Sequence, residues 1–197
     1  MTDQGSIKTL RVLLVDNEPG RAAILEQALR DADYDVIKRT DLGQPLAQMV
    51  ADSQPDMVII DIDAPDRDVL EQMAMVSRAN PRPIVMATEG GDADFVEDAI
   101  RSGVSAYVAN GINPERIRST MAVATARFRE FQALRQELDA ARSELADRKL
   151  IEQAKGLIMQ HRRVSEQEAY QAMRKMAMDR SMPMVNIARN IISVFEI

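Results

Sequence analysis

The segment Arg11-Val-Leu-Leu-Val-Asp-Asn-Glu-Pro19 joins a short run of apolar residues to a polar turn. A run of this length, rich in branched apolar side chains, is typical of a parallel strand that is buried on both faces. Apolar residues then recur at helical spacing at Ala22, Leu25 and Leu29. The segment therefore predicts a buried strand that leads directly into an amphipathic helix.

The same alternation repeats along the next hundred residues. Further strands are expected near residues 34–37, 57–60, 83–87 and 105–108, and further helices near 45–51, 69–76, 94–100 and after Asn113-Pro114. Five strands that alternate with helices through short connections indicate a doubly wound α/β sheet with parallel strands. In such sheets, functional groups gather at the carboxyl ends of the strands.

The composition sets broad limits on function. The 197 residues contain no cysteine, which excludes disulfides, thiolate metal sites and cysteine nucleophiles. No apolar run approaches membrane-spanning length, and the first residues lack a signal-peptide pattern, so no membrane association and a cytoplasmic location are expected.

The charge is divided unevenly along the chain. Residues 148–197 hold nine Lys/Arg and five Asp/Glu, a net charge of +4, and the rest holds 16 and 26, a net charge of −10. A basic tail behind an acidic front favours an anionic partner for the tail. A solvated helical surface is the alternative interpretation of the same charges.

Polar residues follow the predicted strands at one edge of the sheet. Asp16 follows the first strand, and Asp61 and Asp63 follow the third. Carboxylates that converge from neighbouring strands are ligands for Mg²⁺, and an aspartate beside that ion can attack a phosphoryl group. Thr88 follows the fourth strand, and Tyr107 and Asn110 lie at the fifth.

These residues give residues 10–120 a resemblance to the response-regulator receiver domain, a flavodoxin-like (βα)5 fold. Asp61, four residues before Pro65, corresponds to the phosphoacceptor, and Asp16 to the acidic pocket. Thr88 and Tyr107 correspond to the two switch residues of that family.

Two positions depart from the receiver pattern. Asn17 replaces a second pocket acid, and Asn110-Gly111 replaces a lysine followed by proline, so that Asn110 stands at a third switch position. Losing a carboxylate weakens Mg²⁺ binding, and losing the ammonium removes a charge-assisted contact. We therefore expect a degenerate receiver with weak or absent Mg²⁺ and no required cofactor, which serves as a docking and dimerisation platform. A phosphorylation switch at Asp61 is the alternative.

The helix after Pro114 does not end where a receiver domain would. Apolar residues continue at spacings of 3, 4, 3 and 4 through Phe131, Leu134, Leu138, Ala141 and Leu145. This is the seam of a coiled coil, and it predicts a parallel homodimer through residues 121–147. Packing of the seam against the chain's own domains is the alternative.

Three short helices are expected in residues 148–197. The first has an apolar stripe from Leu150 to Ile158. Ser165 followed by Glu168 is a capping box that begins the second helix, and Pro183 suits the first turn of the third. The sequence therefore predicts a tail (1–9), a receiver-like domain (10–120), a coiled-coil connector (121–147) and a three-helix domain (148–197).

The three-helix domain resembles the ANTAR family of RNA-binding transcription antiterminators. The resemblance rests on residues 151–159, which contain Ala-Lys-Gly, on Ala169-Tyr170 and on residues 174–178. Cations meet phosphates, and an aromatic or guanidinium plane can stack on an unpaired base. The RNA-binding residues expected from this resemblance and chemistry are Lys155, Gly156, Arg162, Tyr170, Arg174, Lys175 and Arg180.

The resemblance implies a regulator, not an enzyme, that binds paired stem-loops in a leader RNA and prevents a terminator from forming. Targets in nitrate and nitrite assimilation, and control by a ligand-sensing repressor protein similar to NasS or AmiC, are implied in the same way. DNA recognition by the third helix is disfavoured, because it offers only Asn186, Arg189 and Asn190 as polar readers.

Overall fold

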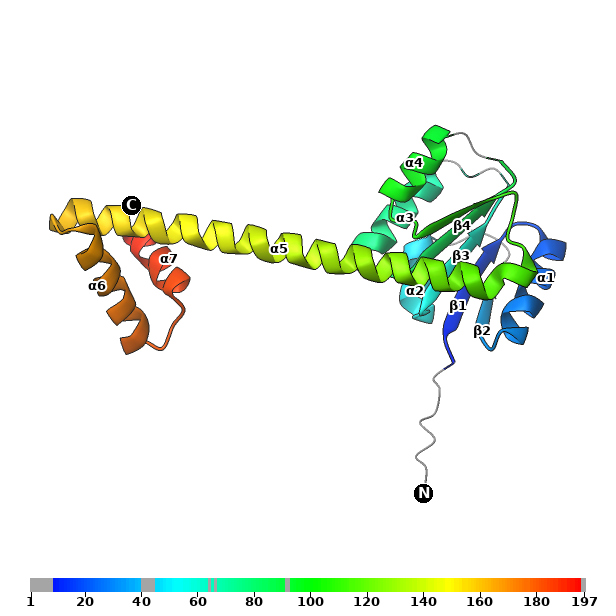
Figure 1. Ribbon diagram of the computed structural model, residues 1–197, viewed down its shortest axis with the longest axis horizontal. Helices are drawn as coiled ribbons and strands as arrows, with labels where there is room; N and C mark the ends of the chain where they lie inside the picture. Colours follow the sequence, from blue (N-terminus) through cyan, green and yellow to red (C-terminus); the bar gives the residue numbers. More distant parts are fainter. Residues whose placement is uncertain (1–8, 40–44, 64, 66, 91–92, 196–197) are drawn as a thin grey trace, which may run out of the picture. The chain divides into compact units, whose positions relative to one another are not determined.

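The computed structural model describes residues 9–39, 45–63, 65, 67–90 and 93–195, so the predicted N-terminal tail lies almost entirely outside the described residues. The chain divides into two compact units, Met1–Phe131 and Gln132–Ile197 (Figure 1). Each unit is described by itself. Among the described residues, no helix is both long and apolar enough to cross a membrane.

The first unit is a five-stranded parallel sheet with the order β2-β1-β3-β4-β5, which confirms the predicted α/β fold (Figure 1). The strands are β1 (Arg11–Asp16), β2 (Asp35–Arg39), β3 (Met57–Asp61), β4 (Ile84–Thr88) and β5 (Ala106–Ala109). The helices are α1 (Pro19–Asp31), α2 (Leu46–Ser53), α3 (Arg67–Ala79), α4 (Ala93–Arg101) and the start of α5 (Ile117–Arg162), which follows a 3₁₀ turn, η1 (Pro114–Arg116).

The helices cover both faces of this sheet. Leu13 and Val15 of β1 pack on the face covered by α2, α3 and α4. Val12 and Leu14 point to the opposite face, which α1 and α5 cover. Alternation along a strand buried on both sides explains why β1 reads as an unbroken apolar run.

Helix α5 is continuous over 46 residues, because its interior contains no proline and its one glycine is tolerated. Met121 and Ala124 are buried in the first unit, which therefore extends past the expected boundary at residue 120. Phe131, Leu134 and Leu138 of the expected seam are about half exposed. This exposure is expected of a coiled-coil seam described without its partner helix. The homodimer itself stays a prediction.

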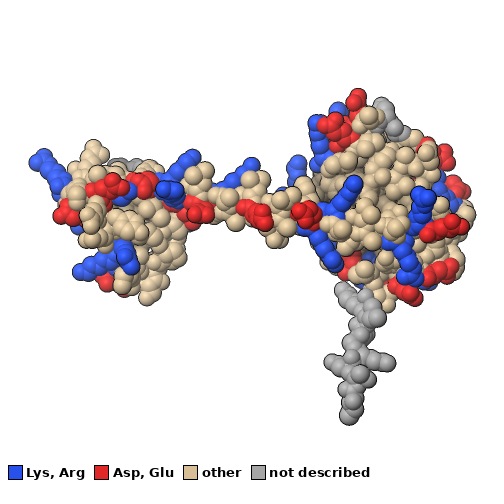
Figure 2. All heavy atoms as spheres, viewed as in Figure 1, with Lys and Arg blue, Asp and Glu red and all other residues tan. Residues whose placement is uncertain are grey.

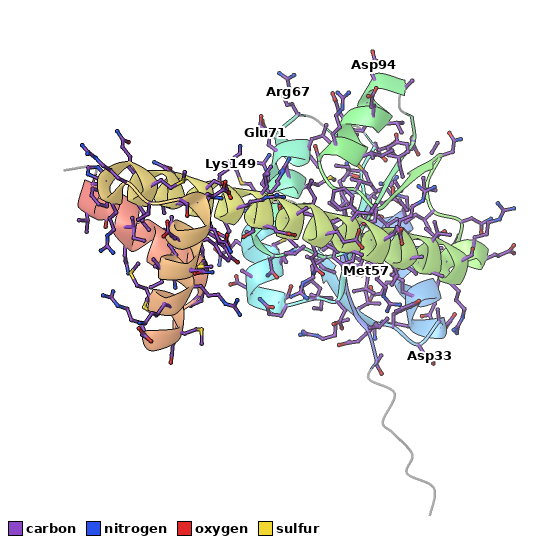
Figure 3. The ribbon with its side chains drawn as sticks, turned by 60° about the vertical axis from the view of Figure 1, so that its left-hand side comes forward. Asp33, Met57, Arg67, Glu71, Asp94 and Lys149 are labelled. Atoms are coloured by element: carbon purple, nitrogen blue, oxygen red, sulfur yellow. The ribbon has the colours of Figure 1, made fainter. Side chains whose placement is uncertain are left out.

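The second unit is formed by the end of α5 with α6 (Glu166–Asp179) and α7 (Met184–Phe195). Its small core consists of Ala154, Ile158, Ala169, Met173, Ala188 and Ile192. The other apolar residues of the predicted stripe on α5, Leu150, Ile151 and Leu157, are partly buried and pack against this core. The methionine side chains can be followed by their yellow sulfur atoms in Figure 3. Ser165 and Glu168 form both hydrogen bonds of the capping box, so the predicted start of α6 is confirmed.

Candidate functional sites

Two aspartates lie side by side at the carboxyl edge of the sheet. Asp16 ends β1, Asp61 ends β3, and the two are direct partners in the register of these strands. The side chains are 0% and 1% exposed, respectively. The parallel pairing therefore brings together two buried carboxylates, as the sequence predicted.

Arg21 of α1 occupies the space between these carboxylates. Its Nη2 donates to Asp16 Oδ1 at 3.0 Å, and its Nε lies 3.4 Å from Asp61 Oδ1. Its Nη1 donates to Asp63 Oδ1 at 2.6 Å. All three acids that the sequence suggested as magnesium ligands thus face one guanidinium, and they form no metal-binding cluster among the described residues.

The first turn of α1 holds Arg21 in this position. Asp16 Oδ1 accepts the N–H of Glu18 at 2.8 Å, and the Glu18 carboxylate accepts the N–H groups of Gly20 and Arg21. Glu18 is therefore the N-cap of the helix and does not replace the missing pocket acid. Asn17 contributes its amide oxygen, which accepts from Arg21 Nη2 at 3.1 Å.

The pocket favours the charged form of Arg21 but disfavours the charged form of Asp61. Burial opposes the charge on Arg21, but hydrogen bonds to Asp16 and Asp63 raise its pKa above the ordinary value. Burial raises the pKa of Asp61 from 3.8 to about 6, although the charge of Arg21 works against this rise. The negative charges of Asp16 and Asp63 add to the rise, and a backbone hydrogen bond from Ile112 opposes it.

The predicted switch residues are already joined. The hydroxyls of Thr88 and Tyr107 lie 2.6 Å apart, and the Tyr107 ring meets Phe95 edge to face at a centroid distance of 6.4 Å. Asn110 is exposed and has φ 63°, and Gly111 has φ 76°. A proline after residue 110 is incompatible with this backbone, because its ring fixes φ near −65°.

In the second unit, Lys155, which the sequence suggested as an RNA contact, is buried in ion pairs with two glutamates. Its residue is 7% exposed, and its Nζ pairs with Glu152 Oε2 at 2.6 Å and with Glu166 Oε1 at 2.7 Å. Hydrogen bonds to Glu152 and Glu166 raise the pKa of Lys155. These two ion pairs connect α5, which carries Lys155 and Glu152, to Glu166 in the first turn of α6.

The remaining predicted RNA-binding residues divide between two places. Tyr170 and Arg174 are exposed one helical turn apart on α6, so they share a face with Glu166. Arg162 and Arg180 instead line a pocket of about 300 Å³ between α5, α6 and α7. Lys175 is exposed on α6, and Gly156 is exposed on α5, where an added Cβ would meet no described atom within 4 Å.

The pocket has an apolar floor and a polar rim. Ile158, Met176 and Ile191 in its lining are buried or half-buried and form the floor, whereas His161, Asn190 and the two arginines are exposed at the rim. His161 stacks on Phe195 with ring centroids 4.3 Å apart and planes 24° apart. Figure 2 shows acidic as well as basic side chains on the visible face of this unit, so no uniform positive patch covers that face.

Family models match both halves of the chain. The response regulator receiver domain matches residues 12–122, more than half of the chain, and the ANTAR domain matches residues 139–192. The chain belongs to the response regulators that carry an ANTAR domain. These two domains indicate a regulatory protein.

Individual relatives agree with this membership. The transcriptional regulatory protein PdtaR of Mycobacterium tuberculosis is 29% identical over 191 residues, which cover 97% of this chain and 93% of PdtaR. The nitrate regulatory protein of Klebsiella oxytoca is 45% identical over 65 residues, which cover 33% of this chain and 16% of that protein. The receiver domain of a putative LuxO repressor protein from Vibrio parahaemolyticus has the same fold, with a TM-score of 0.54, 24% identity and coverage of 64% and 97%.

Receiver domains commonly bind Mg²⁺ beside the phosphoacceptor aspartate, but the side chains of this ANTAR response regulator are not arranged for it. The Oδ1 atoms of Asp16, Asp61 and Asp63 all lie within 3.4 Å of the Arg21 guanidinium, whereas Asp61 Oδ2 is buried without a hydrogen-bond partner among the described residues. A guanidinium and a divalent cation repel each other, and both require the same acceptors. Magnesium therefore does not fit the pocket while Arg21 is in place.

The sequence patterns gave no functional role to Arg21 and did not predict the stacking of His161 on Phe195. Arg21 stands only five residues after Asp16, on the first turn of a helix that begins at the pocket. A cation at this spacing from a strand-end acid is a signal that can be read from sequence. The ring stack joins the ends of α5 and α7, and spacing alone does not predict such a contact.

Proposed function

We propose that this ANTAR response regulator is an RNA-binding transcription antitermination factor whose output surface is the pocket rimmed by Arg162 and Arg180. The supporting observation is the composition of that pocket, an apolar floor with two guanidiniums at its edge. An unpaired base of an RNA loop can occupy such a floor while its phosphates meet the arginines. The matched ANTAR domain supplies the same three helices.

In this proposal Tyr170 and Arg174 form a second contact area on the adjoining face of α6, with Lys175 available to phosphates. Lys155 holds α6 in place without touching the RNA, because both of its acidic partners already surround its ammonium. Gly156 gives a close approach to the backbone of α5, since its exposed surface carries no side chain.

The test uses RNA hairpins selected by the purified full chain from a library with randomised loops. Affinity is measured for the wild type, for Arg162→Ala/Arg180→Ala, and for Arg189→Ala as the matched control. Arg189 is exposed on the same unit, but it lies 3.5 Å from the carboxylate of Asp147. The double variant should lose at least about tenfold in affinity and show a shallower salt dependence, while the control stays near wild type. Equal affinity of all three proteins would refute the assigned surface.

Gly156→Ala separates RNA contact from folding. Alanine in the interior of a helix is favoured over glycine by about 1 kcal/mol, so the free protein should become more stable. If RNA approaches this position, affinity should nevertheless fall. A variant that is both more stable and equally tight in RNA binding would remove Gly156 from the interface.

A homodimer through α5 would present two output units to two stem-loops of one transcript, which raises affinity by an effective-concentration effect. The exposed Phe131, Leu134, Leu138 and Leu145 support this assembly. The similarity to the nitrate regulatory protein supports targets in nitrate and nitrite assimilation. The arginine-filled pocket supports control by a ligand-sensing repressor in place of phosphorylation.

Phosphorylation at Asp61 is the second candidate for control, because Asp61, Thr88 and Tyr107 all lie at the carboxyl edge of the sheet. Treatment with a phosphate analogue and Mg²⁺, followed by measurement of mass and RNA affinity, distinguishes the two modes. A change in assembly or affinity would favour the phosphorylation switch, and no change would favour the repressor.

A further inference from the structure

Arg21 has the surroundings of a bound cation. Its guanidinium contacts the carboxylates of Asp16, Asp61 and Asp63, and Nη1 lies 4.0 Å from Glu89 Oε1. Nη2 also donates to the backbone oxygen of Asp61 at 3.3 Å. Oxygen atoms therefore surround a single positive charge, as they would surround an ion.

These contacts belong to one side chain that is itself largely enclosed. The Arg21 side chain is 19% exposed, whereas Asp16 and Asp61 beneath it are almost wholly buried. Removing Arg21 would leave two buried carboxylates without a counter-charge, which is strongly unfavourable. The pocket thus requires a cation, and its own chain supplies one.

The pocket is also accessible from solvent. Arg21, Asp63 and Glu89 line a surface hollow of about 660 Å³ together with Ile112 and Pro114. A hydrated ion in this hollow could reach Asp63, whereas Asp16 and Asp61 do not line the hollow and are buried behind Arg21. The Arg21 guanidinium, which lines the hollow and contacts both buried carboxylates, therefore stands between them and an incoming ion.

We propose that Arg21 is the resident cation of the receiver, which occupies the acidic pocket in place of a divalent ion and keeps the domain folded without metal. Withdrawal of the guanidinium turns the same carboxylates into a magnesium site. The receiver of this chain is then metal-independent because of one side chain. This inference concerns the first unit alone and does not depend on RNA binding by the second.

The experiment is a titration of the full chain with MgCl₂ alone, followed by calorimetry and by thermal unfolding. The proteins are the wild type, Arg21→Gln, and Arg30→Gln as the matched control. Arg30 lies in the last turn of the same helix, whereas Arg21 lies in the first. Its guanidinium pairs with Glu26 at 2.8 Å and not with the pocket acids. Both variants therefore remove one positive charge from α1, but only Arg21→Gln removes the cation from the pocket.

Wild type and Arg30→Gln should show no saturable binding up to about 10 mM Mg²⁺, whereas Arg21→Gln should bind at least about tenfold more tightly and gain thermal stability with added ion. Saturable binding by the wild type below that concentration would overturn the proposal. An Arg21→Gln protein that folds normally but neither binds Mg²⁺ nor gains thermal stability from it would also overturn the proposal.

Arg21→Gln could fail to fold without metal because of repulsion among the carboxylates. Recovery of its folding on addition of Mg²⁺ would then support the proposal directly. If it stays unfolded, Arg21→Gln/Asp63→Asn has one acid fewer in the pocket and keeps the buried pair. That double variant should bind Mg²⁺ more tightly than Asp63→Asn alone, and equal binding by the two would overturn the proposal.

Discussion

Replacing Asp61 by asparagine should stabilise this protein at neutral pH, although the change removes a charge that faces Arg21. Burial raises the pKa of Asp61 from 3.8 to about 6, so the folded state disfavours the ionised carboxylate. A difference of about 2 units corresponds to about 3 kcal/mol at 1.36 kcal/mol per unit. Water at the exposed rim formed by Asp63 and Glu89 screens part of this effect, so we expect a gain of about 1–2 kcal/mol for Asp61→Asn.

The pH dependence of this gain follows from the sign of the shift. Between about pH 4 and pH 6 the folded state binds more protons at Asp61 than the unfolded state does, so stability falls as pH rises through this window. Asp61→Asn removes that fall. The two proteins should therefore be almost equally stable near pH 4 and should differ most above pH 6.

Urea unfolding monitored by circular dichroism at several pH values measures the difference, with unchanged dependence on urea as the check that the same unit unfolds. Asp63→Asn is the control, because its exposed pair with Arg21 is worth at most about 1 kcal/mol and its loss should not stabilise. A less stable Asp61→Asn at pH 8, or parallel pH profiles for variant and wild type, would refute the reasoning.

Three further predictions concern the helices. Ser165→Ala removes the side-chain cap of α6 and should cost about 1 kcal/mol at pH 7. The hydrogen bond from the Ser165 hydroxyl lowers the pKa of Glu168, so the part of this cost that comes from that bond should persist above pH 4.5 and disappear as pH falls through the lowered pKa. Met173→Ala should cost about 2–5 kcal/mol in urea unfolding, because Met173 is fully buried, whereas the 70% exposed Met178→Ala should change little. Leu138→Lys should lower the mass measured by sedimentation from dimer to monomer, because it places a charge in the seam.

Each of these has a result that would contradict it. Ser165→Ala with unchanged stability at pH 7 would mean that α6 does not depend on its capping box. Equal losses of unfolding free energy for Met173→Ala and Met178→Ala would contradict the assignment of Met173 to the core. A wild type that sediments as a monomer at micromolar concentration would remove the dimer altogether.

The fold could be predicted from sequence because its signals are local and repeated. The apolar run at residues 11–15 and the Ser165–Glu168 pair each report a structure formed within a few residues. The strand order β2-β1-β3-β4-β5 was not predicted, because β1 pairs with both β2 and β3 and the local patterns do not report such pairing. The start of α5 was harder, because Met121 belongs to the receiver core and continues the same helical pattern as the exposed seam.

The sites could be predicted only in part. Asp16 and Asp61 follow from the rule that strand ends converge, but the occupant of their pocket depends on which way Arg21 turns. Lys155 carries the charge that RNA binding requires, yet Glu152 and Glu166 surround it once α6 folds against α5. Long side chains reach partners that are remote in sequence, and residue spacing does not encode their direction.

The continuity of α5 also bears on how the chain acquires its structure. Starting a helix is much less favourable than extending one, because the first turn fixes several residues for one hydrogen bond. Met121 and Ala124 anchor the beginning of α5 in the receiver core, and Ala154 and Ile158 belong to the second core on the same helix. We therefore expect the receiver core to nucleate the helix that continues into the second unit. A fragment that began at residue 132 would have to nucleate that helix alone.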